Sequence, residues 1–283
     1  MPPQPMTRRA FLTAAGGLVV ATTVAGPAAA TERAKNTDLS PVVLSSDLYA
    51  SPDPQRLAFA IYKGSRPSSS GSAKLALAAP GTVKGTVYPT TLQKAGLPKG
   101  RGVYVAEAIL PIAGAWNALA LIGGKRVPFA IQVNAQPKAP GIGTPAPRAA
   151  SPTKADTLGV KPICTRKPAC PLHAVSLSDV IGTGRPAAAL FATPALCQSQ
   201  YCGPVLDELL KIKAPYEDRV TFVHVDIYRS STGADLSPTV EAWGIETEPW
   251  LYTIDGTGTI VGRLDGAFGG NEMTAQLDAL VAG

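Results

Sequence analysis

A change of hydrophobic pattern at a proline-rich segment constrains the fold of this chain more than any other feature. Residues 136–160, QPKAPGIGTPAPRAASPTKADTLGV, contain five prolines and no apolar periodicity, which is typical of a semi-extended linker. Short β-rich runs precede this segment, and helix and strand patterns alternate after it. A chain of 283 residues is long enough for two ordinary domains. We therefore predict domains at residues 38–135 and 161–283, joined by this linker.

The first predicted domain consists of short, partly alternating β-rich runs between about residues 40 and 135. Turn sequences such as SPDP, SRPSSSGS and GGKR separate these runs, which indicates an antiparallel sandwich. The stretch GVYVAEAILPIAGAWNALALIGG resembles paired strands of an immunoglobulin-like domain, a resemblance that implies core positions for Tyr104 and Trp116. The domain contains no cysteine or histidine, so we assign it no chemistry.

Residues 1–30 have the features of an export signal. Paired arginines, Arg8 and Arg9, precede an apolar, glycine-containing run that ends in three alanines, which resembles a twin-arginine signal peptide cleaved near Ala30. An uncleaved membrane anchor, or peripheral membrane association, is the alternative. We therefore predict an extracytoplasmic protein, in the periplasm, in the cell envelope or secreted. Disulfides persist there, and four cysteines suggest two pairs.

The charge of the chain gives little evidence for a polyanionic partner. The formal net charge is +6, and no run of lysine and arginine is interleaved with aromatic residues. We therefore predict that the protein does not bind nucleic acid.

The second predicted domain has an α/β pattern from Pro162 onward. The expected helices are SLSDVIGTG, QYCGPVLDELLKI, LSPTVEAWG and NEMTAQLDALVA, and the expected strands are PAAALFAT, VTFVHVDIY, WLYTID and GTIVGRLDG. From the first strand the order is β-α-β-α-β-β-α, which predicts a central sheet with helices on both faces.

This order, with cysteines where the first strand meets a helix, resembles the thioredoxin fold over residues 176–283. The stretches Phe191 to Pro204 and Trp243 to Trp250 match the family without a gap. The resemblance implies thiol–disulfide exchange, and it implies that Pro249 is the cis-proline that lines the substrate groove. Two features depart from the family pattern: four residues rather than two separate the cysteines, and Leu190 replaces a buried acid.

Cys197 and Cys202 are the predicted catalytic pair. A helix N-terminus stabilises a thiolate, and we place Cys197 there as the attacking thiol. Cys202 falls on the apolar stripe of the following helix, which predicts a buried resolving thiol. Residues five apart in an intact helix are separated by about 7.5 Å of rise, too far for a disulfide. The bond therefore requires Cys197 in the preceding loop or an unwound first turn.

Two other functions remain open. The cysteine spacing resembles a peroxiredoxin branch of the same fold, with peroxide as substrate in place of protein thiols or disulfides and Arg263 as the candidate for polarising peroxide. A non-catalytic scaffold fits the departures at Leu190 and Glu248. If Glu248 adjoins the active thiol, its charge opposes thiolate formation and raises the thiol pKa; otherwise it is a solvated surface acid.

The other cysteines, Cys164 and Cys170, lie in a proline-rich stretch, where we predict a structural disulfide. A second redox pair that serves Cys197 is an alternative. A further alternative is a metal site that also uses His173, but no fourth ligand is evident in the sequence. We therefore predict no metal and no cofactor. His224 is expected to be a buried, hydrogen-bonded strand residue, and Asp226 to be structural.

Overall fold

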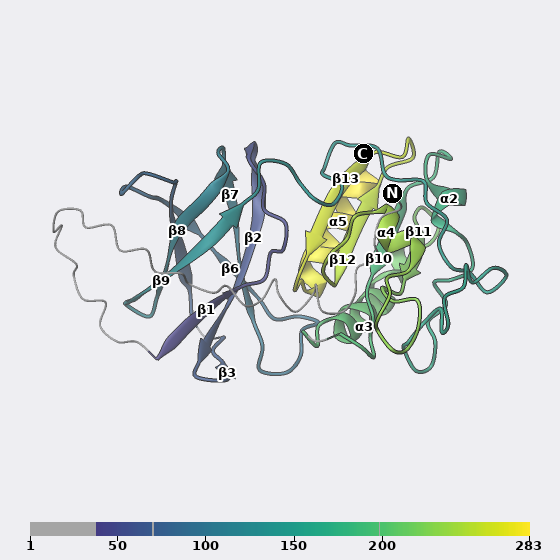
Figure 1. Ribbon diagram of the computed structural model, residues 1–283, viewed down its shortest axis with the longest axis horizontal. Coiled ribbons are helices and arrows are strands. Elements are labelled where there is room, and N and C mark those ends of the chain that lie inside the picture. Colours follow the sequence, from purple (N-terminus) through teal and green to yellow (C-terminus); the bar gives the residue numbers. More distant parts are fainter. Residues whose placement is uncertain (1–37, 70, 198) are drawn as a thin grey trace.

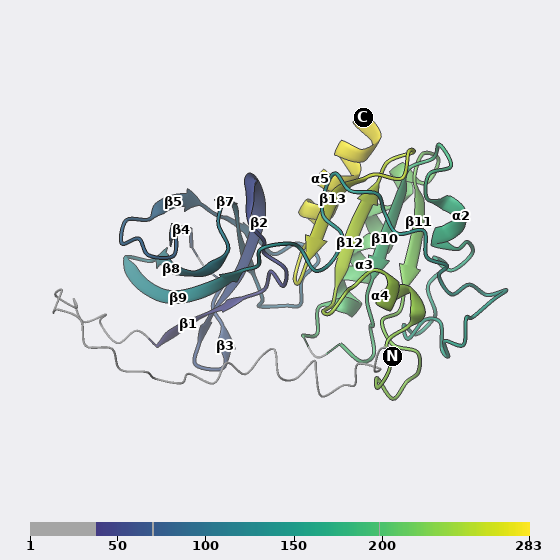
Figure 2. The ribbon, with the colours of Figure 1, turned by 45° about the horizontal axis from the view of Figure 1, so that its top comes forward.

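The computed structural model describes residues 38–283 except for residues 70 and 198. The predicted export signal lies outside these residues. Figures 1 and 2 show two parts side by side: a β-sandwich, and an α/β part whose strand β13 and helix α5 face the sandwich.

The β-sandwich consists of two antiparallel sheets. One has the order β1-β2-β7-β6 with β3 paired to β2, and the other has the order β5-β4-β8-β9. Tyr104 and Trp116 are buried in the core between the sheets, as predicted. The strands are β1 (Leu39–Val43), β2 (Ser51–Lys63), β3 (Arg66–Pro67), β4 (Ala73–Ala78), β5 (Thr86–Pro89), β6 (Thr91–Gln93), β7 (Val103–Leu110), β8 (Gly114–Ile122) and β9 (Lys125–Val133).

Strands β3, β5 and β6 were not predicted from the sequence. They are two to four residues long, and most of their residues are exposed or half-buried. A strand this short offers too few alternating apolar positions for its pattern to be detected.

The α/β part contains a four-stranded sheet with the order β11-β10-β12-β13. β10 is parallel to β11 and antiparallel to β12, which is antiparallel to β13. This is a thioredoxin-like arrangement, as the resemblance implies. The elements are α2 (Leu177–Val180), β10 (Ala187–Phe191), α3 (Cys202–Ile212), the 3-10 helix η1 (Ala214–Tyr216), β11 (Thr221–Val225), α4 (Pro238–Ala242), β12 (Trp250–Ile254), β13 (Ile260–Asp265) and α5 (Gly270–Ala282).

Helices cover both faces of this sheet, as predicted. Alternate residues of β10 point to opposite faces because the side-chain period of a strand is two. Ala188 and Leu190 pack with α3 and α5 in one apolar cluster. Ala187, Ala189 and Phe191 pack with α2 and α4 in the other.

The proline-rich segment 136–160 is packed against the α/β part. Ala139 and Ala146 are buried in the cluster beneath α2 and α4. The backbone N–H of Gly143 donates to the carbonyl of Ile260 at 2.8 Å, and the N–H of Ile260 donates to the carbonyl of Thr144 at 3.0 Å. Residues 143–146 of the segment therefore lie against the start of β13 and the turn that precedes it.

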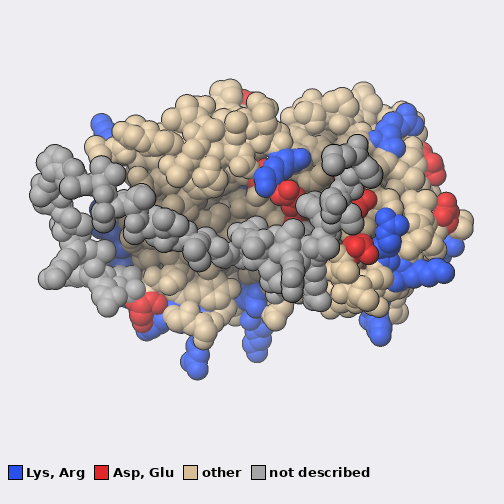
Figure 3. Space-filling view, viewed as in Figure 1, with Lys and Arg blue, Asp and Glu red and all other residues tan. Residues whose placement is uncertain are grey.

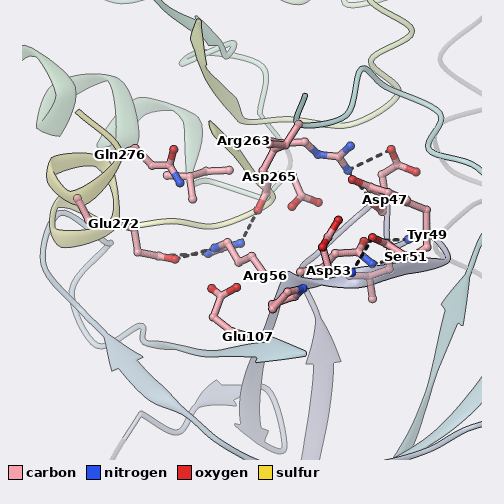
Figure 4. A pocket seen from close by; sticks show the side chains of 16 residues that line it. Asp47, Tyr49, Ser51, Asp53, Arg56, Glu107, Arg263, Asp265, Glu272 and Gln276 are labelled. Atoms are coloured by element: carbon pink, nitrogen blue, oxygen red, sulfur yellow. Dashed lines mark hydrogen bonds and ion pairs between the residues drawn. The ribbon is translucent and has the colours of Figure 1, made fainter. Parts of the chain in front are cut away.

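A buried ion pair joins the sandwich to the α/β part. The Nε of Arg56 on β2 lies 2.6 Å from Oε1 of Glu272 on α5, and both side chains are about nine-tenths buried. The Arg56 guanidinium also donates to the carbonyls of Asp265 and Ala267. This pair lines a cleft of about 400 Å³ between the two parts, shown in Figure 4.

A second buried ion pair borders the same cleft. Arg263 on β13 donates to the carbonyl and the carboxylate of Asp47 at 2.7 and 3.1 Å (Figure 4). Its guanidinium also lies over the Trp250 ring. None of the cleft's lining residues is a cysteine.

On the face shown in Figure 3, the described lysine and arginine side chains lie in small separate groups with acidic residues among them. No helix in the described part of the chain is long and apolar enough to cross a membrane.

Candidate functional site

The loop between β10 and α3 holds Cys197, and Cys202 is the first residue of α3. The predicted placement of Cys197 at the helix N-terminus holds for its sulfur, which accepts the N–H of the first residue of α3, although the residue itself lies in the preceding loop. The loop is folded by tight turns: the N–H of Cys197 donates to the carbonyl of Thr193 at 3.1 Å, and the N–H of Gln200 donates to the carbonyl of Cys197 at 3.2 Å. Gln200 has a φ of 63°, which is incompatible with a continuous right-handed helix.

This loop brings the two cysteines together without any helical turn between them. The backbone N–H of Cys202 points at the sulfur of Cys197, with a nitrogen–sulfur distance of 3.4 Å. The side chain of Cys202 is fully buried with Val205, Leu206 and Leu209, which confirms the predicted apolar stripe. The geometric obstacle to a disulfide in a continuous helix is therefore absent.

The two thiols differ in acidity. The pKa of Cys197 is lowered to about 6, chiefly by a hydrogen bond from the Cys202 thiol. Burial opposes this shift. Hydrogen bonds from Ser199 and from the backbone N–H groups of Cys202 and Tyr201 add to it. Burial raises the pKa of Cys202 well above its usual value, and the adjacent Cys197 raises it further. Cys197 is half-exposed and ionised at neutral pH, whereas Cys202 is buried and protonated.

Glu248 lies directly beside both thiols. Its carboxylate accepts the backbone N–H of Thr193 at 2.9 Å, and one of its oxygens lies within 4.8 Å of each sulfur. Glu248 also precedes Pro249 across a cis peptide bond, as the resemblance implies for this proline. Pro249 comes just before Trp250, which pairs with Phe191 at the end of β10. Glu248 and Pro249 therefore lie beside the start of the loop that holds Cys197.

The expected effect of Glu248 on Cys197 requires correction. The pKa of Cys197 is lowered, because the hydrogen bonds it accepts outweigh the unfavourable surroundings. The pKa that rises is that of Glu248 itself, to about 8, chiefly through burial and then through the charge on Cys197. Glu248 thus supplies a titratable carboxyl group beside the buried thiol, where Leu190 offers only an apolar side chain.

Arg101, from the loop before β7, was missed by the sequence analysis. Its guanidinium donates to the carbonyl of Ser199 at 2.9 Å and to Oε1 of Gln200 at 2.8 Å. It also lies 5.2 Å from the ring centre of Tyr201. The β-sandwich therefore contacts the cysteine loop directly, although that sandwich contains no residue that sequence reasoning marked as functional.

Arg263, the candidate for polarising peroxide, makes its interactions away from the cysteine loop. Its guanidinium binds Asp47 and lies over Trp250 in the cleft between the two parts. Its interactions are those of a structural ion pair rather than those of a group held beside a thiolate.

The second pair of cysteines lies in a separate buried cluster. Cys164 and Cys170 are free thiols in the structure, and the disulfide predicted between them is not formed there. Their sulfurs instead lie 3.8 and 3.4 Å from Nδ1 of His224 on β11, and His173 completes the cluster. His224 is buried and hydrogen-bonded as predicted, and the carboxylate of Asp226 accepts the N–H and hydroxyl of Thr165.

Several solved structures are similar to parts of this chain at low identity. A protein described as the thiol:disulfide interchange protein DsbE from Chlorobium tepidum is 18% identical with a TM-score of 0.37, over 50% of this chain and 98% of that one. A thioredoxin family thiol:disulfide interchange protein from Chlorobium tepidum TLS is 15% identical with a TM-score of 0.33, over 50% and 99% of the two chains.

The Lin-41 filamin domain is 12% identical with a TM-score of 0.25, over 35% of this chain and 95% of that one. No protein-family model and no curated protein matches this chain. The α/β part has a thioredoxin-like strand order, with helices on both faces of its sheet.

Proposed function

We propose that this protein is an extracytoplasmic thiol–disulfide oxidoreductase that uses Cys197 and Cys202. One observation carries the proposal: a half-exposed thiol with a pKa of about 6 lies against the N–H of a buried cysteine that can resolve its adducts. A thiolate is the nucleophile in disulfide exchange, and a thiol with a pKa near ambient pH combines ionisation with nucleophilicity. The predicted export signal supports the location.

In the reductive direction, the Cys197 thiolate attacks one sulfur of a substrate disulfide. A mixed disulfide forms, and the other substrate sulfur leaves as a thiolate that takes a proton from solvent. The Cys202 thiolate then attacks the Cys197 sulfur, which forms the intramolecular disulfide and releases the second substrate sulfur as a thiolate that takes a proton from solvent. The substrate gains two electrons and the cysteine pair loses two. The oxidative direction is the reverse of these steps.

Glu248 is the proton acceptor for Cys202 in this proposal. While Cys197 is a thiolate, its negative charge helps to keep Glu248 protonated. Burial is the larger cause of the raised pKa of Glu248, but formation of the mixed disulfide removes the Cys197 charge, which lowers that pKa and favours the carboxylate. The carboxylate beside Cys202 then accepts the thiol proton at the step that needs it. Pro249, next to this carboxyl group, is buried, and in this proposal it shapes from beneath the groove that receives an extended substrate segment.

Cys202→Ser tests the proposal by trapping its intermediate. The variant should retain the attacking thiol but be unable to resolve the mixed disulfide, so it should accumulate a covalent adduct with a disulfide-containing protein such as insulin. Non-reducing gel electrophoresis and peptide mass spectrometry measure the adduct and locate it at Cys197. Ser199→Ala, in the same loop, keeps both cysteines, so it should turn over without accumulating an adduct, although more slowly because the thiolate loses a hydrogen bond.

Other outcomes of the same experiment point to the other functions. Peroxide consumption with a trapped sulfenic acid at Cys197, and no insulin adduct, would replace this proposal by a thiol peroxidase. Failure to react with either disulfide or peroxide would leave a scaffold protein.

Glu248→Gln separates the role of a proton acceptor from that of an inhibitory charge. If the carboxylate accepts the Cys202 proton, the variant should resolve the mixed disulfide about 100-fold more slowly at pH 7. Its rate should then rise steadily with pH, because ionisation depends on the high pKa of Cys202 itself. Stopped-flow measurement of single-turnover resolution gives these rates.

Glu246→Gln is the matched control, because Glu246 is an exposed acid of the same segment that pairs with Lys138. It should resolve at the wild-type rate. A faster rate in Glu248→Gln would mean that this carboxylate only opposes ionisation of Cys202, and the assigned role would be lost.

A further inference from the structure

A cluster of four metal-ligating side chains lies apart from the Cys197–Cys202 loop. Cys164, Cys170 and His173 come from the segment that precedes the sheet, and His224 comes from β11. All four are at least nine-tenths buried. One potential ligand atom of each lies within 4.8 Å of the corresponding atom of every other. The sequence analysis found three of these groups and lacked the fourth.

The distances within the cluster fit a tetrahedral centre. With Zn–S bonds of about 2.3 Å and Zn–N bonds of about 2.0–2.1 Å, tetrahedral ligation puts two nitrogens about 3.3 Å apart and a nitrogen and a sulfur about 3.6 Å apart. The two histidine nitrogens are 3.1 Å apart. Nδ1 of His224 lies 3.4 Å from the sulfur of Cys170 and 3.8 Å from that of Cys164. Each value is within about 0.2 Å of the tetrahedral one.

The surroundings of His224 prepare Nδ1 for a metal. Its Nε2 lies 2.9 Å from the carbonyl oxygen of Ala192, to which it can only donate. Nε2 therefore carries the proton of the neutral imidazole, and the lone pair of Nδ1 faces the two sulfurs and His173. A metal-bound histidine is commonly held in this way by a carbonyl at its other nitrogen.

Hydrogen bonding alone leaves His173 incompletely satisfied. Among the described residues, its buried Nδ1 has no hydrogen-bond partner. Its Nε2 makes the 3.1 Å contact with His224 inside the cluster. Nε2 of His173 therefore points into the cluster, where a metal ion can replace its contact with His224, whereas the unpartnered Nδ1 is left as it is by a ligand at Nε2.

We propose that Cys164, Cys170, His173 and His224 bind one zinc ion. Two thiolates and two neutral imidazoles form a set typical of structural zinc, with no open position for a substrate. Binding displaces one proton from each thiol, so Zn²⁺ and two thiolates make a complex of zero net charge. A neutral complex suits a fully buried position, where an unpaired charge is costly.

The zinc ion holds the segment that covers the edge of the sheet. β11 is the outer strand, and the N–H of His224 donates to the carbonyl of Leu172 at 2.9 Å. Three ligands come from the covering segment and the fourth from β11, so the metal ties the two together. The same segment contacts the redox loop, because the hydroxyl of Thr165 accepts the N–H of Ala195 at 3.3 Å.

Zinc binding and the disulfide predicted from the sequence are mutually exclusive, because both use the sulfurs of Cys164 and Cys170. The test therefore starts from the mature chain, purified reduced, incubated with excess zinc and passed through metal-free buffer. Inductively coupled plasma mass spectrometry should then find about one zinc ion per chain. Cys170→Ser and His224→Gln should each lower zinc affinity at least about tenfold in chelator competition.

Cys197→Ser is the matched control, because Cys197, Cys202 and Glu248 form the other group of potential ligands in the described residues. Its zinc content should equal that of the wild type. Cobalt substitution of the unmodified chain gives a readout without mutation: tetrahedral Co²⁺ with thiolate ligands absorbs visible light. No retained zinc and no such band in the folded, reduced chain would overturn the proposal. A Cys164–Cys170 disulfide that persists when zinc and reductant are supplied would do the same.

Discussion

Cys197→Ser should abolish disulfide exchange, with the rate of insulin reduction by dithiothreitol falling to the uncatalysed value. We expect a loss of at least about 100-fold, because the variant lacks the only half-exposed thiol of the described residues. The Cys202 thiol cannot substitute for it, since that side chain is fully buried and its pKa is raised well above the usual value.

A pH profile of alkylation distinguishes a reactive thiol from an inert one before any substrate is added. In the wild-type chain, the iodoacetamide reaction rate at Cys197 should rise with pH and level off above a midpoint near 6, the pKa of the thiol. Ser199→Ala should shift this midpoint upward, because Ser199 lies 3.1 Å from the sulfur and its hydroxyl stabilises the thiolate.

In the insulin assay, a Cys197→Ser chain that reduces insulin at the wild-type rate would refute the catalytic assignment.

Arg56→Ala should produce the largest loss of stability among the substitutions considered. The guanidinium of Arg56 makes two hydrogen bonds to the Glu272 carboxylate and two to backbone carbonyls, in a setting that is about nine-tenths buried. Removing it leaves the carboxylate buried without a counter-ion, which should lower the free energy of unfolding by about 3–5 kcal/mol. Urea denaturation followed by tryptophan fluorescence measures this change.

Two further variants identify the cause of that loss. Arg66→Ala removes an exposed arginine of the same sandwich and should change stability by less than about 0.5 kcal/mol. Arg56→Met combined with Glu272→Leu removes both charges and should recover much of the stability, because no buried charge is left unpaired. If Arg56→Ala is as stable as the wild type, the ion pair does not hold the two parts together.

The helix α3 shows which structural features the local apolar pattern predicts and which it does not. Its apolar stripe fixes Cys202, Val205, Leu206 and Leu209 on one face, and all four are fully buried. The start of the helix was less predictable, since apolar periodicity does not reveal the turns at Thr193 and Gln200 that place Cys197 in the loop. Periodicity reports which residues are buried, but backbone turns depend on hydrogen bonds that it does not encode.

The sequence by itself determined the two patterns of secondary structure, the thioredoxin-like order of the second part and the position of the paired thiols at a strand–helix junction. These features follow from residues that are close together in the chain. Only the tertiary structure decided that Glu248 adjoins those thiols, that Arg101 contacts their loop and that His224 joins Cys164, Cys170 and His173. Each of these groups combines side chains dozens of residues apart, and their meeting depends on strand order and on the packing of connecting segments.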